Sequence, residues 1–209
     1  MTAPDNAPSP AATPRSVAVL YGIFFVSGFC GLIYESIWSH YLKMLLGHAA
    51  YAQAVVLVVC VGGLAIGAWL TGRVSERIRR PVRAYALVEA IVALLAFGFQ
   101  AVFERAADWA ATTYLPAVCG GEGACAASWL LAAALILPAS VLLGSTFPLM
   151  SAGVMRLGVR PGRGLSLLYF LNSLGAALGV LGSGFFLISA LGLPGTILLA
   201  GAMNALVAL

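Results

Sequence analysis

Glu35 is a carboxylate near the end of a long apolar run, and the residues around it are of the types that bind organic cations. The segment SGFCGLIYESIW, residues 27–38, places Glu35 beside Tyr34 and one helical turn before Trp38. An ammonium group is attracted to a carboxylate by charge and to aromatic rings by cation–π interaction. Gln53, at the start of the next apolar run, adds a neutral donor and acceptor. We predict that Glu35, Tyr34, Trp38 and Gln53 form a substrate-binding cluster for a small organic cation.

A purely structural role for Glu35 is equally open. Glu35 follows Val17 by eighteen residues, which is ~27 Å along a helix and therefore near the far face of a membrane. At that interface its carboxylate would pair with Lys43 or His40, and Trp38 would belong to the aromatic belt.

Glu89 and Asn172 are a second pair of polar residues inside apolar runs. Glu89 lies six residues past Arg83, ~9 Å along a helix, and Asn172 lies at a similar depth in a later run. Because a carboxylate at the centre of a membrane helix costs about 2.5–3.5 kcal/mol, such a residue needs a partner or a function. We predict a hydrogen bond between Glu89 and Asn172. The alternative is that Glu89 pairs with an arginine of the 73–83 loop.

The composition assigns the chain to the membrane. Hydrophobic residues make up 62% of the sequence and charged residues 9%, and the mean hydropathy is +1.01. About a quarter of the residues of a soluble domain are charged. The apolar runs are long and unbroken, whereas a membrane β-barrel would show short segments of alternating polarity. We therefore predict an all-α membrane protein.

Six apolar runs are long enough to cross a bilayer. A Pro/Ala-rich tail of residues 1–15 precedes a transmembrane domain of residues 16–209, and the first run is too long for a signal-peptide core. The runs are about 17–36, 51–71, 84–103, 126–152, 165–190 and 193–209.

Positive charge orients these runs. Nine of the eleven Lys and Arg residues fall in the tail and in the 73–83 and 156–163 loops, and only Lys43 and Arg105 fall on the other side. Because positive residues of short loops stay in the cytoplasm, the N-terminus is predicted to be cytoplasmic. Two triplets of opposite orientation are what an inverted repeat requires, although the two halves show no convincing match when read as sequence alone.

Cys119 and Cys125 lie in the one long loop predicted to be outside. An oxidising compartment permits a disulfide between them, and two free thiols are the alternative. The two histidines, His40 and His48, are too few for a metal site, and no phosphate-binding glycine motif follows a strand. We predict neither a metal nor a cofactor in this chain, and the basic loops indicate lipid headgroups rather than nucleic acid.

Several segments in order resemble one known family. They are GFCGLIYESIWSHYLKMLLG, GLAIGAWLTGRVSERIRRP, LLGSTFPLMS and LYFLNSLGAALGVLGSGFFLISALGLPGT. Together they are similar to the membrane region of bacterial fused major-facilitator/spermidine synthase-like proteins. The resemblance implies a cytoplasmic aminopropyltransferase-like domain as a partner, which is absent from this chain. The segment GRVSERIRRPVR also resembles the loop after the second span of major-facilitator transporters. That resemblance implies a cytoplasmic latch formed by Glu76, Arg77, Arg79 and Arg80.

These observations lead to two functional hypotheses. In the first, the chain is a transporter-like module of the bacterial inner membrane that binds or moves polyamines, with a homo-oligomer needed to complete it. In the second, it is a membrane anchor and assembly platform for the enzyme, without transport. On either hypothesis this chain alone is not expected to be catalytic.

Overall fold

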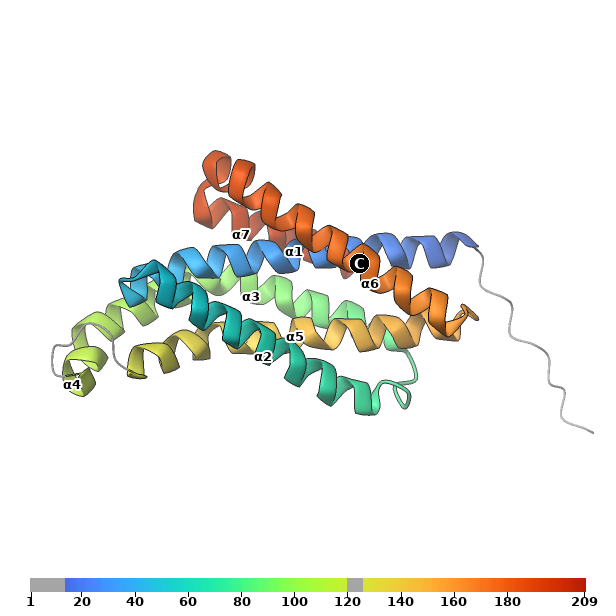
Figure 1. Cartoon of the computed structure of the whole chain (residues 1–209), viewed down its shortest axis with the longest axis horizontal. Coiled ribbons are helices and arrows are strands. Elements are labelled where there is room, and N and C mark those ends of the chain that lie inside the picture. Colours follow the sequence, from blue (N-terminus) through green and yellow to red (C-terminus); the bar gives the residue numbers. More distant parts are fainter. Residues whose placement is uncertain (1–13, 120–125) are drawn as a thin grey trace, which may run out of the picture.

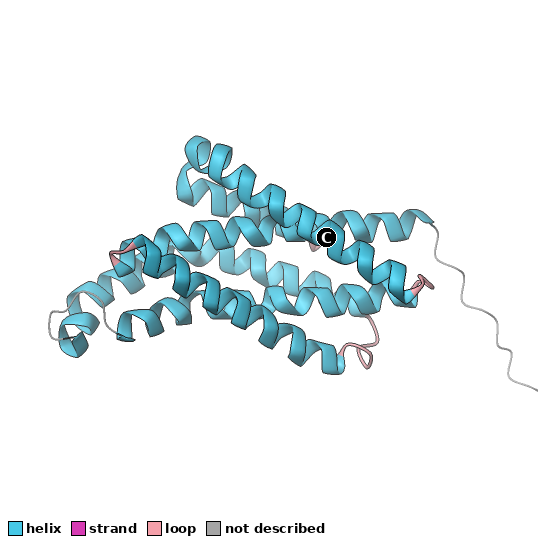
Figure 2. Cartoon of the chain, viewed as in Figure 1, coloured by secondary structure: helices cyan, strands magenta, loops and turns pink. Residues whose placement is uncertain are grey.

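The computed structural model describes residues 14–119 and 126–209, and within these ranges nearly all of the chain is helical, without a strand (Figures 1 and 2). Long helices are joined by short connections, as expected for a chain that must satisfy its backbone polar groups inside lipid. The elements are α1 (Pro14–Leu46), α2 (Ala49–Val74), α3 (Pro81–Trp109), the π-helical turn η1 (Ala110–Tyr114), α4 (Leu115–Cys119), α5 (Ala126–Arg156), α6 (Pro161–Gly182), the π-helical turn η2 (Ser183–Leu187) and α7 (Ile188–Val207).

Five helical stretches are long and apolar enough to cross a membrane. This confirms an all-helical protein of the multi-pass membrane type. The stretches are Arg15–Leu46, Ala49–Val74, Pro81–Val118, Ala126–Arg156 and Pro161–Val207. The last spans 47 residues and contains both the fifth and the sixth of the predicted runs.

The chain reverses direction inside that last stretch, at Gly192. Its backbone has φ 67° and ψ 179°, values far from helical, which glycine adopts without the penalty that a Cβ imposes. Pro194 follows two residues later, where the new helix begins and a missing N–H costs little. In Figure 1 the red end of the chain folds back from the tip of the orange helix.

The side-chain contacts give the direction of each helix. α1 and α3 run parallel, because their contacts advance together along both helices, in the pairs Phe24–Tyr85, Ser27–Glu89, Trp38–Phe99 and Tyr41–Phe103. α6 runs parallel to α1, with Gly175 against Phe25 and Gly179 against Phe29. α7 runs antiparallel to α3, since Gly201 lies against Ala96 whereas Val207 shares a pocket with Val82.

Glycines allow two pairs of helices to approach closely. A Cβ added at Gly67 of α2 would collide with the carbonyl oxygen of Val141 on α5. In the same way, a Cβ at Gly179 of α6 would collide with the carbonyl oxygen of Phe29 on α1. Because lipid supplies no hydrophobic force between helices, such small residues let van der Waals packing hold the bundle together.

These two interfaces are equivalent by a constant shift along the chain. A shift of 112 positions turns Gly67 into Gly179 and Phe29 into Val141, so the two collisions just described are the same contact made twice. The same shift relates the Cys60–Ser140 contact to the packing of Asn172 against Gly28. The shift also aligns identical residues in the sequence. These are Gly63 with Gly175, Gly72 with Gly184, Ala90 with Ala202, Ala93 with Ala205 and Leu94 with Leu206.

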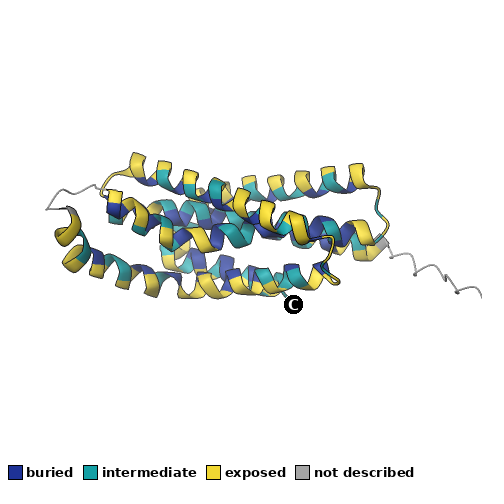
Figure 3. Ribbon diagram, turned by 90° about the horizontal axis from the view of Figure 1, so that it is seen from below, coloured by how far each residue is buried: buried dark blue, intermediate teal, exposed yellow. Residues whose placement is uncertain are grey.

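The buried side chains form two apolar clusters along the bundle. The cluster nearer the N-terminal end of α1, which we name the inner cluster, contains Phe24, Tyr85 and Met150. The cluster nearer the C-terminal end of α1, which we name the outer cluster, contains Cys30 and Val92. In Figure 3 the buried residues follow the sides of the helices that face one another, while the outward sides are exposed. Those outward sides carry large apolar residues such as Leu87 and Phe185, as lipid contact requires.

Candidate functional site

Glu35 lines a pocket between four helices, which we name the Glu35 pocket. Its side chain is half-buried and shares the pocket with Trp38 of the same helix. The pocket encloses about 530 Å³, open space included. The remaining lining residues are Ser27, Gly28, Gly31 and Leu32 of α1, Cys60 and Leu64 of α2, Ser140, Leu143 and Thr146 of α5, and Asn172 and Ala176 of α6.

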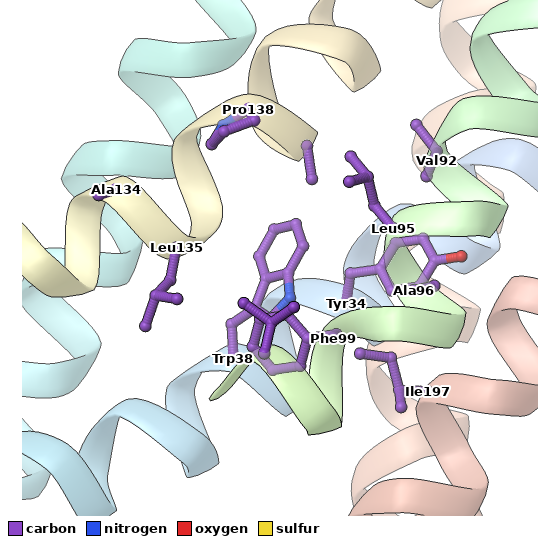
Figure 4. A pocket seen from close by; sticks show the side chains of 12 residues that line it. Tyr34, Trp38, Val92, Leu95, Ala96, Phe99, Ala134, Leu135, Pro138 and Ile197 are labelled. Atoms are coloured by element: carbon purple, nitrogen blue, oxygen red, sulfur yellow. The ribbon is translucent and has the colours of Figure 1, made fainter. Parts of the chain in front are cut away.

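Tyr34 faces a different pocket, which we name the Tyr34 pocket. It lies between α1, α3, α5 and α7 and is almost entirely apolar (Figure 4). Tyr34 and Trp38 are stacked within it, with ring centroids 5.8 Å apart and an interplanar angle of 17°. Both side chains are buried, and neither the Tyr34 hydroxyl nor the Trp38 Nε1–H has a hydrogen-bond partner in the described part of the chain.

Trp38 belongs to both pockets and forms the wall between them. Glu35 and Tyr34 are consecutive residues of a helix, so their side chains point about 100° apart and enter different pockets. The structure therefore brings Glu35 together with Trp38, as the sequence analysis predicted, but places Tyr34 on the other side of the indole.

Gln53 lies apart from both pockets. It is an exposed residue near the start of α2 and is not among the residues that line either pocket. The expectation that it supplies a donor and acceptor beside Glu35 is wrong for this conformation, because its face of α2 points outward from the bundle.

The expected structural partners of Glu35 are also directed elsewhere. His40 uses Nδ1 for the carbonyl oxygen of Ser36, 2.8 Å away, and is exposed. Lys43 is exposed and lies eight residues further along α1, about 12 Å in helical rise. Neither side chain therefore makes a hydrogen bond or ion pair with Glu35 in the described part of the chain.

Glu89 has a different partner from the predicted one. Its Oε1 accepts a hydrogen bond from the Ser27 hydroxyl, with 2.5 Å between the two oxygens. Asn172 instead packs against Gly28 on α1 and lines the Glu35 pocket. The predicted Glu89–Asn172 hydrogen bond is therefore wrong, because similar depth in the membrane does not place two residues on facing sides of their helices. The alternative pairing of Glu89 with an arginine does not occur either, since Oε1 accepts from Ser27 and Oε2 has no hydrogen-bond partner among the described residues.

The turn in which the family resemblance predicts a latch is contacted by a residue that the sequence analysis did not assign to it. Arg156, in the last turn of α5, donates hydrogen bonds to the backbone carbonyl oxygens of Arg79 at 2.6 Å and Glu76 at 3.0 Å. The side chains of Glu76, Arg77, Arg79 and Arg80 are exposed. The turn is thus held through its backbone. The feature of the sequence that could have identified Arg156 is a basic residue in the last turn of a predicted helix, where such side chains donate to carbonyl oxygens.

The cysteines divide between described and undescribed parts of the chain. The predicted Cys119–Cys125 disulfide involves side chains outside the described residues. Cys30 and Cys60 are buried free thiols inside the bundle. In the ranges that the structure describes, no group of three His, Cys, Asp or Glu side chains is arranged to hold a metal ion.

Comparison with family models, curated proteins and solved structures found no match to this chain.

Proposed function

We propose that this chain is a transporter-like membrane module that binds small organic cations in the Glu35 pocket. The observation that carries the proposal is the shared pocket of the Glu35 carboxylate and the Trp38 indole between four helices. An intramembrane carboxylate that faces a pocket is a functional candidate by default, because it is costly to keep in lipid without a ligand or partner.

The chemistry of the pocket suits an ammonium group. The carboxylate supplies charge, and the indole face supplies cation–π attraction that strengthens as water is excluded. Further polar groups reach the pocket from the other helices: Cys60 of α2, Ser140 and Thr146 of α5, and Asn172 of α6. The hydroxyls of Ser140 and Thr146 already donate to carbonyl oxygens of their own helix, so they offer the pocket only lone pairs, which an ammonium donor requires.

For the membrane topology we propose six spans, a cytoplasmic N-terminus and two inverted repeats, α1–α3 and α5–α7. The reversal at Gly192 supports a sixth span, since α7 runs antiparallel to α3. The constant shift of 112 positions relates α2 to α6 and α1 to α5. A repeat of three spans must be inverted in the membrane, because an odd number of crossings ends on the opposite side.

The family resemblance extends the proposal to a biological setting. It suggests polyamines as the cations, the bacterial inner membrane as the location, and a cytoplasmic aminopropyltransferase-like domain and a second copy as partners. The competing proposal, an anchor for that enzyme without transport, makes the opposite prediction for the pocket, namely that it binds no amine.

Isothermal titration calorimetry of the purified protein in detergent tests the proposal. Putrescine and spermidine should bind the wild type, and Glu35→Gln should abolish binding while leaving the fold intact, because glutamine keeps the shape and removes the charge. Binding should also weaken at low pH, where protonation of Glu35 removes the same charge.

Glu104→Gln is the matched control. Glu104 is an exposed carboxylate on α3 that accepts a hydrogen bond from Gln100 at 2.9 Å, away from both pockets. The Glu104→Gln variant should bind amines as the wild type does. Absence of amine binding to the wild type would favour the membrane-anchor proposal. Equal losses of amine affinity in Glu35→Gln and Glu104→Gln would indicate nonspecific attraction of cations.

A further inference from the structure

Glu89 is buried without a compensating cation. Its exposed fraction is 0%, and of its two carboxyl oxygens only Oε1 has a hydrogen-bond donor, the Ser27 hydroxyl. Oε2 is buried and has no hydrogen-bond partner in the described part of the chain. An ionised carboxylate in such surroundings would carry the full desolvation cost of a charge and of an unpaired acceptor.

The groups that face Glu89 are neutral. From α1 these are Ser27, Cys30 and Tyr34, and from its own helix Tyr85, one turn earlier. The Tyr85 hydroxyl lies beside Ser27 and Glu89 but makes no hydrogen bond of standard geometry. Hydroxyl and thiol groups carry no positive charge, so none of them is a counter-ion for a carboxylate.

Asn204 of α7 adds an unpaired amide at the same level of the bundle. Gly201 of α7 lies against Ala96, and Val207 shares a pocket with Tyr85, so Asn204 lies between these levels of α3. Glu89 falls within that interval. Asn204 is fully buried, and its Oδ1 and Nδ2 both lack a hydrogen-bond partner among the described residues.

Apolar residues separate this polar layer from both ends of the bundle. The inner cluster, with Phe24, Tyr85 and Met150, lies on one side. The outer cluster, with Cys30 and Val92, lies on the other. Glu89 itself is fully buried between the two clusters, so a proton on its carboxyl group is not in direct contact with bulk water in this conformation.

From this geometry we propose that Glu89 is a proton-binding site inside the membrane, occupied in the conformation described. Oε1 is the carbonyl oxygen that accepts from Ser27, and Oε2 carries the proton. The site is distinct from the Glu35 pocket and does not depend on that pocket binding an amine. Ser27 connects the two, because it lines the Glu35 pocket and donates to Glu89.

Infrared spectroscopy of the full chain in detergent tests the proton directly. At neutral pH the wild type should show the carbonyl stretching band of a protonated carboxylic acid, and Glu89→Gln should lose it. Glu104→Gln, which changes an exposed carboxylate, should keep the band. Ser27→Ala leaves the acid in place but removes a hydrogen bond to its carbonyl oxygen, so the band should move to higher frequency.

A second readout uses a hydrophobic carbodiimide, which adds to protonated carboxyl groups in apolar surroundings. The peptide that contains Glu89 should gain the mass of the reagent, and Glu89→Gln should not. The proposal is overturned if the wild type has no acid band at neutral pH, or if its band is unchanged in both Glu89→Gln and Ser27→Ala. If Glu89→Gln does not fold, the shift in Ser27→Ala decides.

Discussion

Gly67 of α2 lies so close to Val141 of α5 that a single added carbon would strike the Val141 carbonyl oxygen. Gly62 is five residues away on the same helix and has nothing within 4 Å of the position that its Cβ would occupy. The two glycines therefore separate the effect of helix packing from the effect of a glycine-to-alanine change on the helix itself.

We expect Gly67→Ala to destabilise the protein by about 1–3 kcal/mol, the usual cost of overpacking. Gly62→Ala should be neutral or slightly stabilising, because alanine favours the helix and meets no neighbour. Thermal unfolding in detergent, followed by circular dichroism, measures both. Equal melting temperatures for the two variants would contradict the close approach of α2 and α5.

The topology prediction is tested by single cysteines introduced into a variant whose native cysteines are replaced by alanine or serine. Arg77→Cys and Arg160→Cys lie in the loops expected to be cytoplasmic, and Asp108→Cys lies near the opposite end of α3; all three positions are exposed. In intact cells a membrane-impermeant thiol reagent should label Asp108→Cys alone. Labelling of Arg77→Cys from outside would reverse the proposed orientation.

The Cys119–Cys125 disulfide is expected to be a local brace. It would close a loop of only seven residues, so its stabilisation should fall below the ~3 kcal/mol of a 15-residue loop. Mass spectrometry of the unreduced protein should find this peptide two hydrogen masses lighter than its reduced form. Two alkylated thiols in the unreduced sample would establish free cysteines instead.

Trp38 should determine how tightly the Glu35 pocket holds an amine. Removing a desolvated cation–π contact costs about 2 kcal/mol, and Trp38→Leu should therefore weaken binding by roughly thirtyfold. Trp38→Phe keeps an aromatic face and should lose less. Trp129→Leu is the control, because Trp129 is exposed and contacts Tyr51 away from the pocket. An unchanged affinity in Trp38→Leu would remove the indole from the binding site.

If both proposals hold, amine binding and proton binding should be linked through Ser27. A cation in the Glu35 pocket favours negative charge nearby, so binding should release a proton from Glu89. Calorimetry in buffers of different ionisation enthalpy counts that proton. Ser27→Ala should bind amine but release less of the proton, and Glu89→Gln should release none. Amine binding without any proton release in the wild type would show that the two sites are not coupled, although each site could still exist.

The sequence was sufficient to predict the class of fold, and insufficient to predict which residues contact each other across helices. Predictions from hydropathy and charge average over many residues, so an error at one position changes them little. The partner of Glu89 depends on the rotation of each helix about its axis, and that rotation decides whether Ser27 or Asn172 faces it. Tyr34 and Glu35 show the same limit, because adjacent residues entered different pockets.

The topology suggested an inverted repeat, but its register could not be read from the sequence, for a related reason. Only a few small residues, such as Gly63 with Gly175 and Gly67 with Gly179, match at the shift of 112 positions. Glycines four apart are common in membrane helices and gave no register by themselves. The register became evident from backbone contacts, where the Gly67–Val141 and Gly179–Phe29 approaches coincide.

The repeat also has a consequence for motion. The two halves contact each other through two equivalent interfaces, α2 with α5 and α6 with α1. These interfaces differ in detail, with Cys60 against Ser140 in one and Asn172 against Gly28 in the other. Each interface therefore has a packing shape that the other interface could adopt. Exchanging the two shapes would produce a second arrangement of the bundle, related to the first by reflection of its openings across the bilayer. If the chain transports its ligand as proposed, we expect alternating access to be such an exchange, with Gly67 and Gly179 as the pivots about which the helices rock.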